Sequence, residues 1–137
     1  MPSYAYDKDA GIDLHAHLTD PVSLHPGHRV LIPTGLFVRI PSGYEGQVRP
    51  RSGLALKQGV TVLNSPGTID AGYTGEIGVI LINLGHDVCR VTDGDRIAQM
   101  VVAPVIHVKW TQWTDDDPQT APSGRADKGF GSSGQSC

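Results

Sequence analysis

Residues 60–82 read Val60-Thr-Val-Leu-Asn-Ser-Pro-Gly-Thr-Ile-Asp-Ala-Gly-Tyr-Thr-Gly-Glu-Ile-Gly-Val-Ile-Leu-Ile82, two apolar runs joined by a polar turn that is rich in Gly and Pro. Val60–Leu63 leads into the turn and Ile77–Ile82 leads out of it, and both runs contain many β-branched residues. This pattern predicts a β-hairpin with a shaped mouth. Asp70 and Tyr73 lie in the turn, and loops held by rigid strands often carry catalytic and binding residues.

The chain on both sides of the hairpin also shows strand patterns. Apolar residues recur at every second position between Val30 and Ile40, apart from Thr34, which predicts a half-buried strand interrupted near Pro33-Thr-Gly35. Residues 77–82 are apolar on both faces, so we expect a central strand between two layers. Many short strands at regular spacing predict an all-β fold, a jelly-roll-like β-sandwich. The other predicted elements are short strands at Gly46–Arg49, Val88–Val91, Ile97–Val102 and Val105–Trp110, and a helical turn at Leu54–Lys57 that the hydroxyl of Ser52 caps.

Composition supports the same class of fold. The 137 residues include 17 Gly and 10 Pro, together about a fifth of the chain against a usual ~12%. So many helix-breaking residues leave little room for long helices, and the length suits one domain that benefits from oligomerisation. The apolar periodicity stops after Trp113. We therefore expect a β core over residues 1–113 and a flexible C-terminal arm over residues 114–137.

Charge and cysteine content exclude several classes of function. The formal net charge of −3 argues against broad nucleic-acid binding through the phosphate backbone. Two cysteines, Cys89 and Cys137, are too few for a disulfide framework, which predicts a cytoplasmic protein, and Cys89 is expected to pack as a small apolar residue. No apolar run approaches the ~18 residues that suggest a membrane span. The six histidines, at positions 15, 17, 25, 28, 86 and 107, lack the spacing of a zinc site and are interpreted as surface residues.

Two further motifs suit phosphate groups. Arg51-Ser52-Gly53 offers a guanidinium, a hydroxyl and an unhindered backbone N–H in succession, although a surface Arg beside a helix cap would look the same. Gly129-Phe-Gly-Ser-Ser-Gly134 matches the G-x-G-x-x-G dinucleotide pattern, but no strand precedes it and only three residues follow. It is interpreted either as a Gly/Ser tail or, with Arg125 upstream and Phe130 inside, as a phosphate cradle with a stacking ring.

The hairpin turn resembles motif three of the trimeric deoxyuridine triphosphate nucleotidohydrolases, the dUTPases. Four more stretches resemble the other motifs of that family in the expected order: Ala10–Leu14, Pro50–Ala55, Gly94–Gln99, and Arg125 with Gly129–Gly134. The resemblance implies a jelly-roll homotrimer in which each active site draws on all three chains. The implied reaction is the hydrolysis of dUTP to dUMP and pyrophosphate, which limits uracil in DNA and supplies dUMP for dTMP synthesis.

The resemblance also implies roles for residues of the turn. Asp70, a carboxylate that is ionised at neutral pH, would be the general base for the water that attacks the α-phosphorus. Outside the family, an Asp in this position is a common turn residue. Tyr73 would lie under the deoxyribose, where a 2′-hydroxyl would clash, instead of serving as a core aromatic. The uracil pocket would be lined by Asn64, Thr68, Ile69 and the backbone near Gly78.

The remaining motifs would hold the phosphates and the metal. Arg51, Ser52, Gly53 and Gln99 would contact the α- and β-phosphates. In the arm, Arg125 would contact the γ-phosphate, Phe130 would stack on uracil, and Gly131 and Ser132 would bind phosphate oxygens. Asp13 would reach Mg²⁺ only through water, because the triphosphate supplies most ligands of this ion. Asp95 and Arg96 are interpreted as a structural ion pair.

Two alternative functions stay open on the sequence. A deoxycytidine triphosphate deaminase shares the fold, but it needs a catalytic Glu on the strand after the turn, where this chain has Ile80. A non-catalytic dUTP-binding regulatory module would retain the pocket without needing both Asp70 and Arg125.

Overall fold

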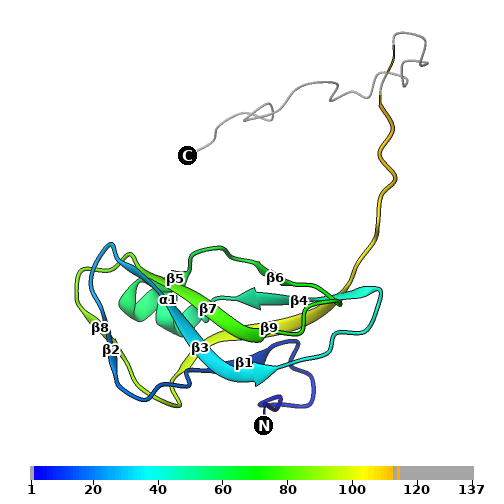
Figure 1. Ribbon diagram of the computed structural model, residues 1–137. Helices are drawn as coiled ribbons and strands as arrows, with labels where there is room; N and C mark the ends of the chain where they lie inside the picture. Colours follow the sequence, from blue (N-terminus) through cyan, green and yellow to red (C-terminus); the bar gives the residue numbers. More distant parts are fainter. Residues whose placement is uncertain (1, 113, 115–137) are drawn as a thin grey trace. The chain divides into compact units, whose positions relative to one another are not determined.

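The computed structural model of the protein describes residues 2–112 and residue 114 (Figure 1). Contacts divide the chain into two units, Met1–Ile106 and His107–Cys137. The first unit contains every strand and helix that the described residues form. Among these residues, no helix has the length and apolar character needed to cross a membrane.

The first unit is built from antiparallel strands in three sheets. The largest sheet has the order β1-β9-β4-β6, the second has the order β3-β7-β5, and β2 pairs with β8. This architecture confirms the predicted all-β sandwich. The strands are β1 Ile12–His15, β2 Val22–Leu24, β3 Arg29–Phe37, β4 Tyr44–Arg49, β5 Val60–Val62, β6 Gly67–Ile69, β7 Glu76–Asn83, β8 Cys89–Val91 and β9 Arg96–Pro104, and the single helix is α1 Ser52–Gln58.

The predicted hairpin exists, but its turn reaches across to another sheet. β5 pairs antiparallel with β7, and Val62 lies opposite Leu81. The connection between them contains β6, which pairs with β4 in the four-stranded sheet, so that Ile69 lies opposite Gly46. Gly46 allows this close approach, because a Cβ there would come within 3.2 Å of the Ile69 Cβ and 3.3 Å of the Met100 sulfur. The turn that carries Asp70 is therefore held by two sheets.

The core lies between the sheets. Side chains from both large sheets and from the β2–β8 pair form one apolar cluster, which includes Leu14, Ile32, Val79 and Met100. In β7 every second residue from Ile77 to Asn83 is buried, and the residues between them are half-buried. β7 is central in its sheet, as predicted, but its second face is only partly covered in the single chain.

Two local predictions are wrong. Val105–Trp110 forms no strand in the part of the chain that the structure describes: β9 ends at Pro104, and Val105 only donates its N–H to the Gly43 carbonyl at 2.9 Å. The residues from Ile106 to Trp110 are exposed, and an alternation of apolar residues forms a strand only where its backbone pairs with an adjacent strand. The helix is not capped by Ser52: its N-cap residue is Arg51, with extended backbone and no capping hydrogen bond from its side chain. The interruption of β3 is confirmed, since its register shifts between Pro33 and Phe37.

Candidate active site

The strand ends of the four-stranded sheet form a basic pocket with Asp13 inside it. The pocket has a volume of about 530 Å³, and its lining includes Asp13, Arg49, Arg51, Arg96 and Gln99. These residues come from β1, from the end of β4 and the segment that follows it, and from β9. Arg51 and Asp13 are both partly buried, with side chains 28% and 25% exposed, so their interaction is only partly screened by water.

Asp13 holds two guanidinium groups together. Its Oδ1 lies 2.9 Å from Arg51 Nε and its Oδ2 lies 3.6 Å from Arg96 Nη1. Arg51 Nη1 also donates to the Arg96 carbonyl at 3.3 Å. A guanidinium has five N–H donors, so these contacts leave several donors of Arg51 for an anion. The predicted pair between Asp95 and Arg96 is wrong: the Asp95 carboxylate instead accepts from the backbone N–H and hydroxyl of Thr92.

Gln99 supports the same corner from the neighbouring strand position. It lies opposite Asp13 across the β1–β9 pair, and its Nε2 donates to the Pro50 carbonyl at 2.9 Å. Gly11 lies against the side-chain oxygen of Gln99, and a Cβ at Gly11 would overlap that oxygen. Together these contacts fix the segment Pro50–Arg51. Ser52 and Gly53 follow it at the helix start and are exposed, and a Cβ at Gly53 would meet nothing within 4 Å.

The hairpin turn presents its polar side chains to solvent. Asp70, Asn64 and Thr68 are exposed, and Ile69 is half-buried on β6. The Tyr73 backbone N–H donates to the Asp70 carbonyl at 3.0 Å, which closes the turn directly after the carboxylate. The Tyr73 ring is 42% exposed, and its hydroxyl donates to the Glu76 carbonyl at 2.7 Å.

The backbone at Gly78 faces a gap in the β5–β7 ladder. The Leu63 N–H donates to the Ile80 carbonyl at 2.9 Å, and the ladder ends there among the described residues. Gly78 lies two residues before Ile80 along β7, so its N–H and C=O point to the same side of the strand as those of Ile80, the side of β5. Its neighbour on the other side is Pro33, which has no N–H and whose carbonyl accepts from His17. The Gly78 backbone therefore offers one donor and one acceptor beside the hairpin mouth.

The basic pocket and the hairpin are not joined in the single chain. No lining residue of the basic pocket comes from the segment between Asn64 and Gly78. The structure therefore brings together Asp13, Arg51 and Gln99, and separately groups Asn64, Thr68, Ile69, Asp70, Tyr73 and Gly78 around the hairpin. Arg125, Phe130, Gly131 and Ser132 lie outside the described residues.

The five motifs and this geometry agree with a match to a family model. The model described as dUTPase matches residues 1–134. The chain belongs to the dUTPase family. Among curated relatives, the deoxyuridine 5'-triphosphate nucleotidohydrolase of Ehrlichia canis is 58% identical over 134 residues, which cover 98% of this chain and 86% of the relative. The protein of the same name from Chlamydia caviae is 51% identical, covering 98% and 91%.

Solved dUTPase structures share the fold. The dUTPase of Staphylococcus bacteriophage 80alpha bound to dUpNHpp has a TM-score of 0.81 and 31% identity, covering 98% of this dUTPase chain and 92% of that one. A mutant dUTPase from phage phi11 of S. aureus, described with a coordinated structural Mg(II) ion, has a TM-score of 0.75 and 26% identity, covering 85% and 90%.

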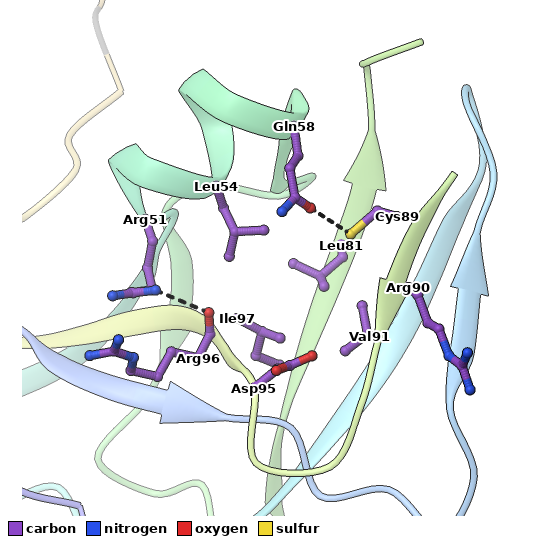
Figure 2. A pocket seen from close by; sticks show the side chains of 10 residues that line it. All are labelled: Arg51, Leu54, Gln58, Leu81, Cys89, Arg90, Val91, Asp95, Arg96 and Ile97. Carbon is purple, nitrogen blue, oxygen red and sulfur yellow. Dashed lines mark hydrogen bonds between the residues drawn. The ribbon is translucent and has the colours of Figure 1, made fainter. Parts of the chain in front are cut away.

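A second pocket of this dUTPase lies behind Arg51 and was not predicted from the sequence. Figure 2 shows α1 above it, Arg51 and Arg96 at one side, and Cys89 and Val91 at the other. Cys89 is buried in it and donates to Gln58 Oε1 at 3.0 Å. Burial, and secondarily the charge of Asp95, raises the pKa of the Cys89 thiol. The prediction that Cys89 packs as a small apolar residue is confirmed, since it belongs to the buried core cluster, and the thiol is held in its neutral form.

Sequence reasoning missed the partners that hold the site residues in place. Arg96 and Gly11 lie inside recognised motifs, so proximity to Arg51 and Gln99 could have been suspected from the motif positions. Glu76, whose backbone carbonyl accepts from the Tyr73 hydroxyl, shows no such signal in the sequence. All six histidines are exposed, as predicted, and the described residues contain no group of three His, Cys, Asp or Glu side chains that could hold a metal ion.

Proposed function

We propose that this dUTPase hydrolyses dUTP to dUMP and pyrophosphate, with the basic pocket binding phosphates and the hairpin binding the nucleoside. The observation that carries this proposal is the pair Asp13–Arg51 inside a basic pocket, in a chain that also presents Asp70 on a rigid turn. Relatives named deoxyuridine 5'-triphosphate nucleotidohydrolase match nearly the whole chain, which supports this substrate.

Arg51 and its neighbours suit the α- and β-phosphates. The Asp13 carboxylate and the Arg96 carbonyl fix the guanidinium of Arg51 before substrate arrives, so less side-chain entropy is lost on binding. Ser52 adds a hydroxyl, and Gly53 leaves its backbone N–H open to approach. Gln99 holds the Pro50 carbonyl and contributes to the same subsite. Arg125, Gly131 and Ser132 of the arm would complete the contacts to the triphosphate, and Phe130 would stack on uracil.

Asp70 acts as the general base in this proposal. An exposed carboxylate can take a proton from a water that attacks the α-phosphorus, and pyrophosphate then leaves. The oxygen of that water becomes part of dUMP, and the transferred proton returns to solvent from the carboxyl. Arg51 stabilises negative charge on the phosphate oxygens as the reaction proceeds.

The Gly78 backbone suits recognition of uracil. Its free N–H and C=O match an acceptor and a donor on the base edge, and Asn64, Thr68 and Ile69 surround the hairpin mouth. A site that depends on such hydrogen bonds discriminates against a base with mismatched groups by ~10⁴ or more. Tyr73 would lie beneath the sugar.

The donor set fits Mg²⁺ that arrives with the nucleotide. The described residues offer no cluster of carboxylates, and Asp13 is already paired with Arg51 and Arg96. Mg²⁺ keeps several waters and is commonly held by one carboxylate and the substrate phosphates. Asp13 would reach it through water, and the bound ion would neutralise charge on the phosphates.

A homotrimer with shared sites would join the two halves of the site. The basic pocket contains no hairpin residue, and large apolar side chains such as Leu31, Phe37 and Val102 are exposed in the single chain. A second copy that covers such side chains and brings its own hairpin to the pocket would account for both observations. The absence of a membrane-spanning helix among the described residues agrees with the proposed cytoplasmic location.

Pyrophosphate release from dUTP, with UTP, dTTP and dCTP as controls, tests this function. We expect efficient release from dUTP alone. Ammonia release from dCTP would instead favour the deaminase, although Ile80 supplies no carboxylate at the required position. Tight dUTP binding without turnover would favour the regulatory module.

A further inference from the structure

The phenol end of Tyr73 lies directly over Gly75. A Cβ built on Gly75 would come within 2.5 Å of the Tyr73 hydroxyl oxygen and 2.7 Å of the ring carbon that carries it. Carbon atoms in ordinary contact are ~3.5–4.0 Å apart, so any side chain at position 75 would have to displace the ring by about 1 Å. The hydroxyl is also tied to the Glu76 carbonyl at 2.7 Å.

The backbone beneath the ring is fixed to another strand. The Glu76 carboxylate accepts from the Gly35 N–H at 2.6 Å, and the Thr34 hydroxyl donates to the Ile77 carbonyl at 2.6 Å. Gly35 has a φ of +65° at the interruption of β3, a conformation that favours glycine. Because Glu76 and Ile77 are anchored in this way, movement of the backbone after Gly75 is opposed. A collision at Gly75 is relieved more easily by the Tyr73 ring, which is exposed.

We propose that Gly75 is a specificity-determining residue: its missing side chain sets the depth at which the Tyr73 ring lies, and thereby the rejection of a 2′-hydroxyl. This inference rests on the proposed function, in which Tyr73 lies beneath the deoxyribose. Gly75 touches no substrate atom and acts only through Tyr73. A ring displaced from Gly75 loses its bond to the Glu76 carbonyl and is no longer held in a fixed position against the 2′ carbon of the sugar. Displacements of this size are enough to change substrate positioning.

The direct test is Gly75→Ala, with Gly72→Ala as the matched control. Neither glycine has a positive φ, and a Cβ at Gly72 would meet nothing within 4 Å. Both variants therefore add one methyl group to the same turn, and only one collides with the ring. We expect the ratio of kcat/KM for dUTP to kcat/KM for UTP to fall at least ~10-fold in Gly75→Ala, within the range of small steric changes in a pocket. The ratio should stay within two-fold or so of the parent in Gly72→Ala.

A double variant separates this inference from a general loss of structure. If Gly75 acts through the ring, adding Gly75→Ala to Tyr73→Ala should change the dUTP/UTP ratio no further. Tyr73→Phe, which removes only the bond to the Glu76 carbonyl, should lower the ratio by a smaller factor and remains measurable if Gly75→Ala folds poorly. An unchanged ratio in that variant would also count against the anchoring role of this bond.

The outcomes distinguish the two levels of the proposal. An unchanged ratio in folded Gly75→Ala, beside a reduced ratio in Tyr73→Ala, would overturn the role of Gly75 while the proposed function stands. An unchanged ratio in Tyr73→Ala would remove Tyr73 from the sugar site and overturn both assignments. A parent protein that fails to hydrolyse dUTP would contradict the proposed function itself.

Discussion

The basic pocket and the hairpin turn are prepared for substrate in different ways. In the pocket, Arg51 is held by the Asp13 carboxylate and the Arg96 carbonyl. In the turn, Asp70 is exposed, and only its backbone carbonyl takes part in the hydrogen bond that closes the turn. A cation that must bind phosphate benefits from being fixed in advance. In the proposed shared site, Asp70 would act on the substrate of a neighbouring chain, and its exposed position on the turn suits that role.

Removal of the residues after Thr120 should have the largest effect on turnover, because the arm would complete the phosphate contacts of the basic pocket. The core should remain folded, because every described strand and helix ends by Pro104. Turnover of dUTP should fall by the ~10³–10⁵ that a comparable Arg contributes in phosphoryl transfer, since Arg125 is lost. Pyrophosphate release measures this, with circular dichroism as the control for folding. Near-parental turnover of the truncated protein would exclude a catalytic contribution from the arm.

Asp70→Asn tests the role of the hairpin turn. The change is nearly isosteric and lies at an exposed position, so folding and dUTP binding should persist. Turnover should fall by ~10²–10⁴, the usual contribution of a general base. Stopped-flow binding and steady-state turnover separate the two properties. Turnover within a few-fold of the parent would reduce Asp70 to a turn residue.

Asp13→Asn tests whether fixing Arg51 in advance matters. Hydrogen bonds to charged groups contribute ~1.5–3 kcal/mol, so we expect affinity for a non-hydrolysable dUTP analogue to fall ~10–100-fold. If Asp13 acts mainly on Arg51, this loss should appear both with Mg²⁺ and in EDTA; a role through metal-bound water alone predicts a loss only with Mg²⁺. Asp20→Asn, at an exposed position away from the pocket lining, is the control.

The features that can be predicted from the sequence are those that depend on local pattern. The β5–β7 ladder and the broken β3 follow from periodicity and from Pro33 and Gly35. The pairing of β6 with β4, and the contact of Asp13 with Arg96, join segments far apart in the chain. Such contacts depend on how the sheets pack, which no local pattern reveals. For the same reason Arg96 was assigned to its neighbour Asp95 instead of to Asp13.

Cys89, which lies in the second pocket behind Arg51, gives the smallest expected effect. Its raised pKa means that the folded chain holds the thiol proton more tightly than the unfolded chain. The resulting stability is present below about pH 9 and is lost as the pH rises through the folded value. In a Cys137→Ser background, alkylation should be at least ~10-fold slower in the native than in the unfolded protein. Equal rates would contradict the buried, neutral thiol.

The shared site is tested most directly by mixing two inactive chains. Asp70→Asn and the chain truncated after Thr120 are unfolded, combined in equal amounts and refolded, and mixed trimers are confirmed by mass. A working site then needs Asp70 from a truncated chain and an arm from an Asp70→Asn chain. Random assembly in a closed three-fold ring gives this combination at roughly a quarter of sites, so about a quarter of the parental dUTP turnover should return. Activity that stays at the level of the separate variants, in trimers shown to be mixed, would contradict the shared site and place Asp70 and the arm of each site on one chain.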